Sequence, residues 1–512
     1  MIVFFLGYLF YHGDEVQPTG FIQYDNVSYM AYAKEYTEAD SFSLRYSNPF
    51  NDKFYKPIYF QPQTLFFAAL IKTGIPPGWI LIPFTLFFSL ICFRLIIAIY
   101  DLIVPDKSFR TLHIWFFAWG GGLLTIAGAF AHFILNKNDN FLDSIFILDP
   151  ERGWWGLNLG RSLFFTCEAY YHAVFLGCIY FLLKRKWLPG LLLVFLLSVS
   201  HPFTGIELIS IIGLWCIVEF IINKKNIPLW FMSGILLILI FHVWYYLFYL
   251  NQFADHKSVS EQYALGWRLR FFRIIPAYFI TGLLAIFSIY NESVKNFFVQ
   301  RSNRLFACWF LAAFMLANHE IFIKAMQPIH FTRGYIWTSL FLLGLPALLQ
   351  WNKFLQKKYG YAAIVFFATI FFLDNFLWVF NIVYTKAETP FPTYISKEQK
   401  QVLKWLDEES SNKTLIISSD PTISYLSTVY TKAYPWYSHP YTTPFAEKKK
   451  SIQNKFLSTG VLDSSWINRE INFVLTTKDT ASSISLMNYH VEKIFQTENY
   501  LVLKYIPPKT KQ

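Results

Sequence analysis

The sequence has few charged residues and few cysteines. Only 15% of its 512 residues are charged, whereas 54% are hydrophobic and 21% are aromatic. This composition lies outside the usual range of soluble globular domains and indicates an integral membrane protein. The five cysteines fall inside or at the edge of apolar runs and show no CxxC spacing. Neither a disulfide framework nor a cysteine metal site is indicated.

A cleavable signal peptide and a nucleic-acid partner are also not indicated. The opening "MIVFFLGYLFY" has no basic region before its apolar residues and no small-residue cleavage site. The formal charge is +11, but the lysines and arginines cluster in short loops between apolar runs. Such loops are typical of the cytoplasmic side of a membrane protein, which explains the charge without nucleic acid.

Apolar runs of about 14 to 25 residues recur along the chain and predict transmembrane α-helices. The predicted fold is an all-α multi-pass membrane protein of about eleven helices with a small α/β domain at the C-terminus. The predicted spans are residues 2–12, 79–103, 111–134, 162–183, 187–200, 204–223, 228–250, 270–290, 304–318, 331–350 and 361–384.

The basic loops fix the predicted orientation in an inner or plasma membrane. They lie on one side of this span list, which we assign to the cytoplasm. Residues 57–74 are apolar, but a span there would invert the loop before it, so we predict a non-spanning helix in the membrane interface. The first loop, residues 13–78, and everything after residue 384 then face outside.

Residues 1–384 are therefore predicted to form the transmembrane domain, and residues 385–512 a soluble extracytoplasmic domain. Apolar positions at helical spacing near residues 402–406 precede the strand-like "TLIISS". Further strands are predicted at 471–477 and 500–506, which suggests a small α/β layer. This domain contains no GxGxxG or GxxxxGK loop, so nucleotide binding is disfavoured.

The first outer loop contains the segment "GFIQYDNVSYMAYAKEY". Asp25 is followed by Tyr29, Ala33, Lys34 and Glu35 at intervals that place it at the first turn of a short helix. A solvated loop carboxylate is the simplest interpretation of one aspartate, but a carboxylate at a helix end is also a suitable mount for a catalytic base.

In this order of residues, the loop resembles that of the GT-C superfamily of membrane glycosyltransferases, of the aminoarabinose-transferase and protein O-mannosyltransferase type. The following "FYKPIYFQPQTLFFAALIKTGIPPGW" resembles their Lys-Pro-Pro-Leu-Tyr segment, with Lys56 at the lysine. The tail is similar to the C-terminal domain of poorly characterised bacterial members. Members often have Asp-Glu where this chain has Asp25 and Asn26, so a metal site is not favoured and no cofactor is expected. Asp14 and Glu15 are an alternative acidic pair.

The resemblance implies sugar transfer from a polyprenyl-phosphate carrier to a hydroxyl acceptor on the outer face, as in cell-envelope polysaccharide biosynthesis. The acceptor can be a lipid, a glycan or a protein. Asp25 would be the catalytic base, and Tyr29, four residues later, would set its position on the helix. A cationic clamp would stabilise the departing phosphate.

The clamp is predicted in "IKAMQPIHFTRGY", which offers Lys324, His330 and Arg333 beside the start of a span. Related transferases have a Lys-x-Pro-His-Tyr-like segment here, and Arg333 is the best clamp candidate. The alternative is interfacial anchoring, in which Lys and Arg reach toward the headgroups and Tyr335 and Trp337 form an aromatic belt.

Two further positions, Arg152 and His201, are candidates for substrate binding. Arg152, in the loop "ILDPERGWWGLNLGRS", lies beside tryptophans that suit either sugar recognition or interfacial anchoring. His201, in the corner "SVSHPFTG", could bind a phosphate or sugar, or cap a helix. Glu168 and His172, four residues apart in one span, are predicted to face the same cavity. A transporter of lipid-linked saccharides and a non-catalytic scaffold remain alternative functions.

Overall fold

A computed structural model describes residues 14–38, 43–51, 56–134, 163, 165–224, 226–266, 268, 271–386, 392–459, 471–477 and 490–506. The chain forms two compact units. The first, called here the helical unit, comprises Phe84–Tyr246 and Ala264–Thr385. The second, called the mixed unit, comprises Ile2–Pro83, Leu247–Tyr263 and Lys386–Gln512. The predicted first span, residues 2–12, lies outside the described residues.

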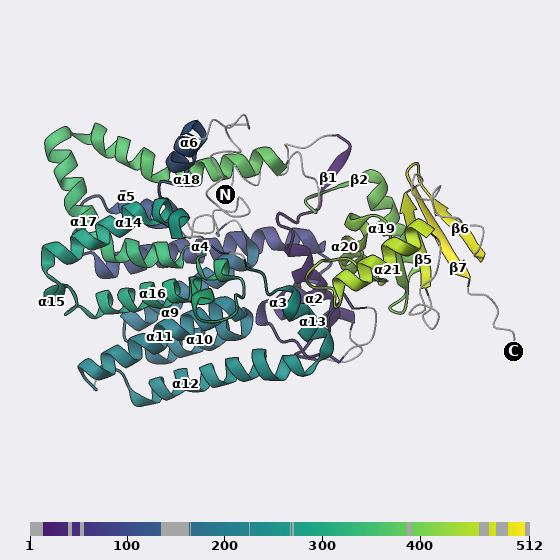
Figure 1. Ribbon diagram of the computed structural model, residues 1–512, viewed down its shortest axis with the longest axis horizontal. Coiled ribbons are helices and arrows are strands. Elements are labelled where there is room, and N and C mark those ends of the chain that lie inside the picture. The colour runs from purple at the N-terminus through teal and green to yellow at the C-terminus, as the bar shows by residue number, and fades with distance from the viewer. Residues whose placement is uncertain are drawn as a thin grey trace. The chain divides into compact units, whose positions relative to one another are not determined.

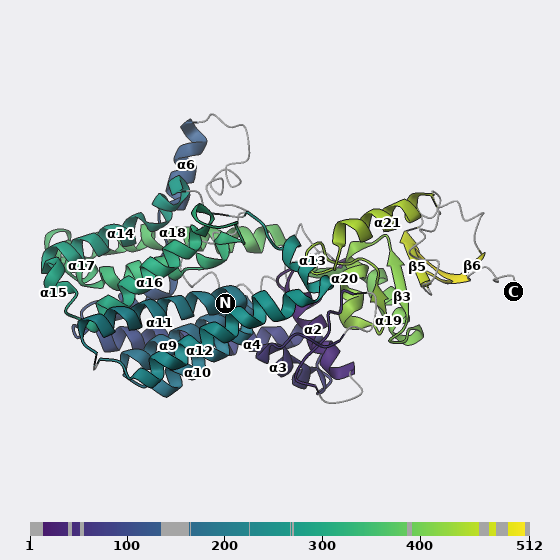
Figure 2. The ribbon, with the colours of Figure 1, turned by 60° about the horizontal axis from the view of Figure 1, so that its bottom comes forward.

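The helical unit is built from long apolar helices (Figure 1). Its described helices are α4 (Pro77–Ile103, which begins in the mixed unit), α5 (Arg110–Trp119), α6 (Leu124–Ile134), α9 (Thr166–Leu183), α10 (Trp187–Ser200), α11 (Pro202–Ile222), α12 (Leu229–Val243), α14 (Phe271–Glu292), α15 (Val294–Phe297), α16 (Arg301–Ala317), α17 (Tyr335–Tyr359) and α18 (Tyr361–Lys386). Helices α9, α10, α11 and α12 pack side by side, and α17 packs against both α14 and α16 (Figure 2).

The predicted multi-pass helical architecture agrees with these helices. Six helices in the described part of the chain are long and apolar enough to cross a membrane, or seven if one bent pair is a single span. The segment predicted not to span forms α3 (Pro62–Ile71), whose ten residues rise only about 15 Å and cannot cross about 30 Å of hydrocarbon. The predicted total of about eleven spans stays a prediction.

The predicted span at residues 111–134 is broken. Helices α5 and α6 meet at an angle of 57° across three consecutive glycines, Gly120–Gly122. A Cβ atom on Gly122 would lie 2.3 Å from the carbonyl oxygen of Ala277, so only glycine fits this close approach to α14. The sequence-based prediction treated the run as continuous because hydropathy does not detect this close packing.

Side chains from other helices replace the backbone hydrogen bonds that the break removes. The Asp374 carboxylate on α18 accepts hydrogen bonds from the backbone N–H groups of Gly122, Leu124 and Thr125 at 2.8–3.1 Å. The Asn375 amide donates to the carbonyl oxygen of Gly120 at 3.1 Å. Backbone groups buried in an apolar medium must be paired, so these side chains make the break tolerable.

The substitution Asp374→Ala should destabilise the helical unit, because it leaves three buried N–H groups unpaired. A loss of at least about 3 kcal/mol is expected, seen as a melting temperature lowered by roughly 5 °C or more in detergent. Asp101→Ala is the matched control. It removes an exposed carboxylate that pairs with Arg110 at 2.6 Å, a type of contact worth about 1 kcal/mol or less. Equal shifts for both variants would contradict the proposed role of Asp374.

The mixed unit combines segments that are far apart in sequence. From its N-terminal and middle segments come β1 (Val16–Pro18), α2 (Asn26–Glu38), α3 and α13 (Ala254–Gln262). From the tail come β2 (Tyr394–Ser396), α19 (Lys397–Glu409), β3 (Leu415–Ser418), α20 (Pro421–Tyr430), β4 (Tyr434–Pro435), α21 (Ala446–Thr459), β5 (Ile471–Thr477), β6 (His490–Gln496) and β7 (Tyr500–Ile506). Strand β1 pairs antiparallel with β2, with Val16 opposite Ser396.

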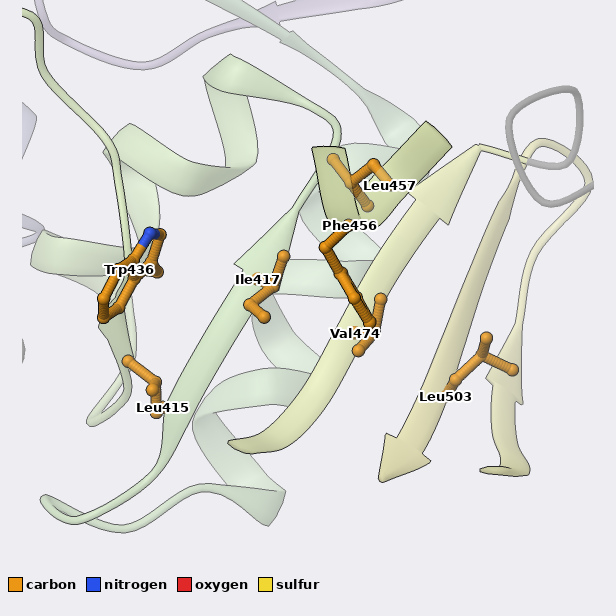
Figure 3. Close-up of a cluster of buried hydrophobic side chains, with 7 residues drawn as sticks. All are labelled: Leu415, Ile417, Trp436, Phe456, Leu457, Val474 and Leu503. Carbon is orange, nitrogen blue, oxygen red and sulfur yellow. The ribbon is translucent and has the colours of Figure 1, made fainter. Parts of the chain in front are cut away.

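The tail contains the predicted α/β layer. Its described strands form one sheet in the order β4-β3-β5-β7-β6, in which β3 is parallel to both β4 and β5 and the other pairs are antiparallel. One face carries a hydrophobic cluster (Figure 3): Leu415, Ile417, Trp436, Phe456, Leu457, Val474 and Leu503. On the other face, Trp405 of α19 lies edge-on to Phe473 at 5.3 Å. The predicted strands at 414–419, 471–477 and 500–506 are confirmed.

Candidate functional site

Asp25 lies at the start of α2, as its sequence spacing predicts. It is the residue immediately before the helix, and its backbone carbonyl accepts a hydrogen bond from the Tyr29 N–H at 3.3 Å. The Asp25 side chain is exposed, whereas Tyr29 is half-buried. Residues Val27, Met30 and Ala31 on the same helix are fully buried. The buried residues fix the helix and present the carboxylate at its exposed end.

Tyrosines from three separate segments lie within electrostatic reach of the Asp25 carboxylate. They are Tyr24 and Tyr32 beside it, Tyr263 after α13, and Tyr425 on α20. Burial raises the pKa of all four phenols, and the negative charge of Asp25 raises each pKa further. The phenols therefore stay protonated, and each keeps an O–H group within the electrostatic reach of the carboxylate. Sequence analysis identified neither Tyr263 nor Tyr425, because each lies more than 200 residues from Asp25.

The tail residues His439 and Tyr425 hold this part of α2 in place. The Tyr425 hydroxyl lies 2.7 Å from the Ser28 hydroxyl and donates to the Tyr24 carbonyl at 2.9 Å. The His439 ring lies 5.0 Å from the Tyr24 ring, and its Nδ1 accepts from the backbone N–H groups of Tyr441 and Thr442. Burial lowers the pKa of His439 to about 3, so the imidazole is neutral.

Helix α13 also forms hydrogen bonds to the tail segment that contains His439. The Gln262 amide donates to the carbonyl oxygens of Tyr441 and Thr443, both at 2.9 Å. The Ser258 hydroxyl accepts from the Phe445 N–H at 2.8 Å. These bonds fix the end of α13, and Tyr263, which directly follows it, is within electrostatic reach of Asp25. The candidate base thus lies at the end of a helix that tertiary contacts hold in place, as precise catalytic positioning requires.

The other first-loop candidates have different environments. Asn26 is fully buried, and neither its amide oxygen nor its amide nitrogen has a hydrogen-bond partner in the described part of the chain. Asp14 and Glu15 are exposed in the turn before β1, and Lys56 is exposed before α3. In the mixed unit, Asp25 is therefore the candidate carboxylate with an organised polar and aromatic environment.

The clamp candidate Arg333 is buried in the helical unit, two residues before the start of α17. Its side chain is 6% exposed, and its guanidinium lies 3.8 Å from a Glu168 carboxylate oxygen. It also hydrogen-bonds to Nδ1 of His330, whose ring stacks on Phe203 at 4.9 Å. An arginine buried this deeply is not anchored at a headgroup surface, which argues against the interfacial interpretation.

The predicted neighbours Glu168 and His172 do face one cluster. His172 Nδ1 lies 2.8 Å from the Tyr335 hydroxyl, and Glu168 pairs with Arg333. The same cluster contains Glu207 of α11, which the sequence analysis did not single out. Glu207 is fully buried, and neither carboxylate oxygen has a hydrogen-bond partner among the residues that the structure describes. The sequence does indicate Glu207 as a candidate functional residue, because it is a glutamate inside an otherwise apolar run.

The remaining predicted residues have simpler environments or lie outside the described ranges. His201 caps α11, because its Nδ1 accepts from the Thr204 N–H at 3.1 Å, and its ring lies 6.3 Å from that of His330. Lys324 is exposed between α16 and α17. Arg152 lies outside the described residues. Over those residues, no group of three or more His, Cys, Asp or Glu side chains could hold a metal ion.

Glu35, ten residues after Asp25, should make the stability of the mixed unit depend on pH. Burial raises the pKa of Glu35 to about 7, although a hydrogen bond from Ser47 opposes this rise. The folded state therefore binds more protons than the unfolded state between the ordinary value of 4.5 and about 7. Stability from this group is fully present below pH 4.5 and is lost as the pH rises through about 7.

Thermal unfolding in detergent at a series of pH values tests this dependence. The variant Glu35→Gln, which cannot ionise, should lose most of the fall in melting temperature between pH 4.5 and 7.5. Glu15→Gln, which removes an exposed carboxylate from the turn before β1, is the control and should retain the wild-type profile. An unchanged profile in Glu35→Gln would show that Glu35 is not the responsible group.

The chain is similar in fold to a solved membrane protein along nearly its whole length. This structure is ArnT from Cupriavidus metallidurans, crystallised bound to undecaprenyl phosphate. The likeness covers 99% of this chain and 97% of that chain, with a TM-score of 0.50 and 10% sequence identity. No family model and no curated protein sequence matches the chain. The fold expected from the resemblance of the first outer loop is therefore confirmed.

Proposed function

We propose, from the GT-C fold of this membrane protein, that it is a glycosyltransferase that uses a polyprenyl-phosphate sugar as its donor. The observation that carries the proposal is the extent of the fold likeness, which includes both the helical unit and the mixed unit. The acceptor is a hydroxyl group of a lipid, glycan or protein. Transfer takes place on the extracytoplasmic face of an inner or plasma membrane.

Asp25 acts as the base in this proposal. Its carboxylate takes the proton of the acceptor hydroxyl as the acceptor oxygen forms a bond to the anomeric carbon. The bond from that carbon to the phosphate oxygen breaks, and the phosphate leaves with the electron pair. The O–H groups of Tyr24, Tyr32, Tyr263 and Tyr425 suit the task of orienting a hydroxylated acceptor, since they stay protonated.

Arg333 acts as the phosphate clamp, with His330 as its neighbour. A guanidinium offers several N–H donors in a planar fork that matches phosphate oxygens. Its contact with Glu168 is long, at 3.8 Å, and a phosphate with more acceptor oxygens can replace it. Phe203 limits the motion of the His330 ring by stacking on it. Divalent metal is not required in this scheme.

A transporter of lipid-linked saccharides is the second candidate, because the helical unit contains a broken span. Transporters commonly bind substrate at the N-terminal ends of such half-helices. Here the N–H groups at the start of α6 already donate to Asp374. This closed arrangement favours a structural role for the break and hence the transferase.

Asp25→Asn should abolish turnover while preserving donor-lipid binding. The amide cannot accept a proton, so a loss of about 10²- to 10⁴-fold in turnover is expected. Turnover is measured with a panel of undecaprenyl-phosphate monosaccharides, and lipid binding with undecaprenyl phosphate by native mass spectrometry. Asp14→Asn, an exposed carboxylate of the same loop, is the control. Full turnover in Asp25→Asn would refute the base, and transport without transfer would favour the transporter.

Arg333→Gln should weaken the binding of undecaprenyl phosphate. Hydrogen bonds to charged groups contribute about 1.5–3 kcal/mol, so the dissociation constant should rise roughly 10- to 150-fold. Lys324→Gln, which removes an exposed positive charge from the same connection, separates a specific clamp from general charge attraction. If both variants lose the same affinity, Arg333 has no special role.

A further inference from the structure

Arg301, the first residue of α16, lies against two indole rings in the helical unit. Its guanidinium carbon is 4.9 Å from the ring centre of Trp187 and 4.6 Å from that of Trp215. Trp187 begins α10, and Trp215 lies within α11, so three helices meet at this point. Cation–π contacts of this kind hold a guanidinium in place but leave its N–H donors unused.

The nearby carboxylate, Glu219, already pairs with another arginine. Arg304 donates from Nε to one Glu219 oxygen at 2.6 Å and from Nη2 to the other at 3.0 Å. The Asn226 amide adds a third hydrogen bond to Glu219 at 2.7 Å. The remaining nitrogen of Arg304, Nη1, donates to the carbonyl oxygens of Phe298 and Val299. Arg304 and Asn226 therefore occupy both Glu219 oxygens, and the Glu219 charge is shared between Arg304 and Arg301.

Buried N–H donors lack acceptors at this position. Nε and Nη2 of Arg301 and the indole N–H of Trp215 are buried without a hydrogen-bond partner in the described ranges. Trp215 is only 1% exposed. The charges of Glu219, Arg185 and Arg304 all act on Arg301, so three arginines face one carboxylate here. Buried donors beside excess positive charge favour an anion with several acceptor oxygens.

Exposed basic and apolar side chains flank this group. Lys184 and Lys186 are exposed on either side of Arg185, immediately before α10. Leu188 at the start of α10 and Ile222 at the end of α11 are 57% and 55% exposed. A lipid with a phosphate headgroup combines the two chemistries that this surface offers, since its phosphate suits the arginines and its chains suit the apolar residues.

We propose that Arg301, Arg185, Trp187 and Trp215 form a second phosphate-binding site, called here the indole–arginine site, which takes the phosphate of an anionic phospholipid headgroup. Free inorganic phosphate presents the same acceptor oxygens without the acyl chains, so it is the other source to be tested. The site shares no residue with the proposed donor clamp at Arg333, and its existence does not depend on the glycosyltransferase assignment.

The test measures the melting temperature of the full-length protein in neutral detergent micelles. Phosphatidylglycerol, phosphatidylcholine and inorganic phosphate are titrated separately. Phosphatidylglycerol should raise the melting temperature of the wild-type protein, and phosphatidylcholine should not. Arg301→Gln should need at least tenfold more phosphatidylglycerol for half of the shift. Lys357→Gln, which removes an exposed charge near the end of α17, should respond as the wild-type protein does.

The outcomes separate the two sources of phosphate. A shift with phosphatidylglycerol alone assigns the site to a lipid headgroup, and an equal shift with inorganic phosphate that depends on Arg301 assigns it to free phosphate. If Arg301→Gln does not fold, Arg301→Lys replaces it and should need at least threefold more lipid, because an ammonium lacks the planar fork. The proposal is overturned if the Arg301 variant responds like the wild-type protein, or if neither ligand shifts the wild-type protein.

Discussion

The helical unit depends on one constraint, that polar backbone groups in an apolar surrounding must find partners inside the protein. Continuous helices meet this constraint by themselves, but the break between α5 and α6 does not. Asp374 and Asn375, neighbours on α18, pair the groups at the two sides of the break. The Trp337 indole also donates to the Gly121 carbonyl at 2.9 Å. Helices α17 and α18 are thereby fixed to a segment more than 200 residues earlier in the chain.

In the mixed unit, the short helix α2 has low hydrophobicity, so tertiary contacts must hold it in place. Helix α2 packs against α3 of the same N-terminal region and against α20 of the tail. Its Ser28 bonds to Tyr425, and the Lys34 ammonium donates to the Thr428 carbonyl at 3.3 Å. The pairing of β1 with β2 brings the two chain regions together just before these contacts. The exposed Asp25 therefore owes its position partly to Tyr425, which lies 400 positions later in the chain.

Buried charges in the helical unit fall into groups with different degrees of pairing. The Arg304–Glu219 pair is saturated with hydrogen bonds and is typical of a structural ion pair. Arg333 lies 3.8 Å from Glu168 and hydrogen-bonds to His330, whereas Glu207 beside it has no hydrogen-bond partner among the described residues. Incomplete pairing of buried groups is costly in a folded protein, and it is commonly retained where a ligand completes the pairing.

The sequence by itself determined the class of protein, most helix positions, the tail strands and the place of Asp25 at the start of a helix, because these follow from local hydropathy and spacing. It also placed Glu168 and His172 on one face. Only the tertiary structure decided which side chains lie within electrostatic reach of Asp25, that α5 and α6 are separate helices, and that Glu207 joins Arg333. Those features depend on contacts between distant segments, and no local pattern encodes which distant residue will fill a given position.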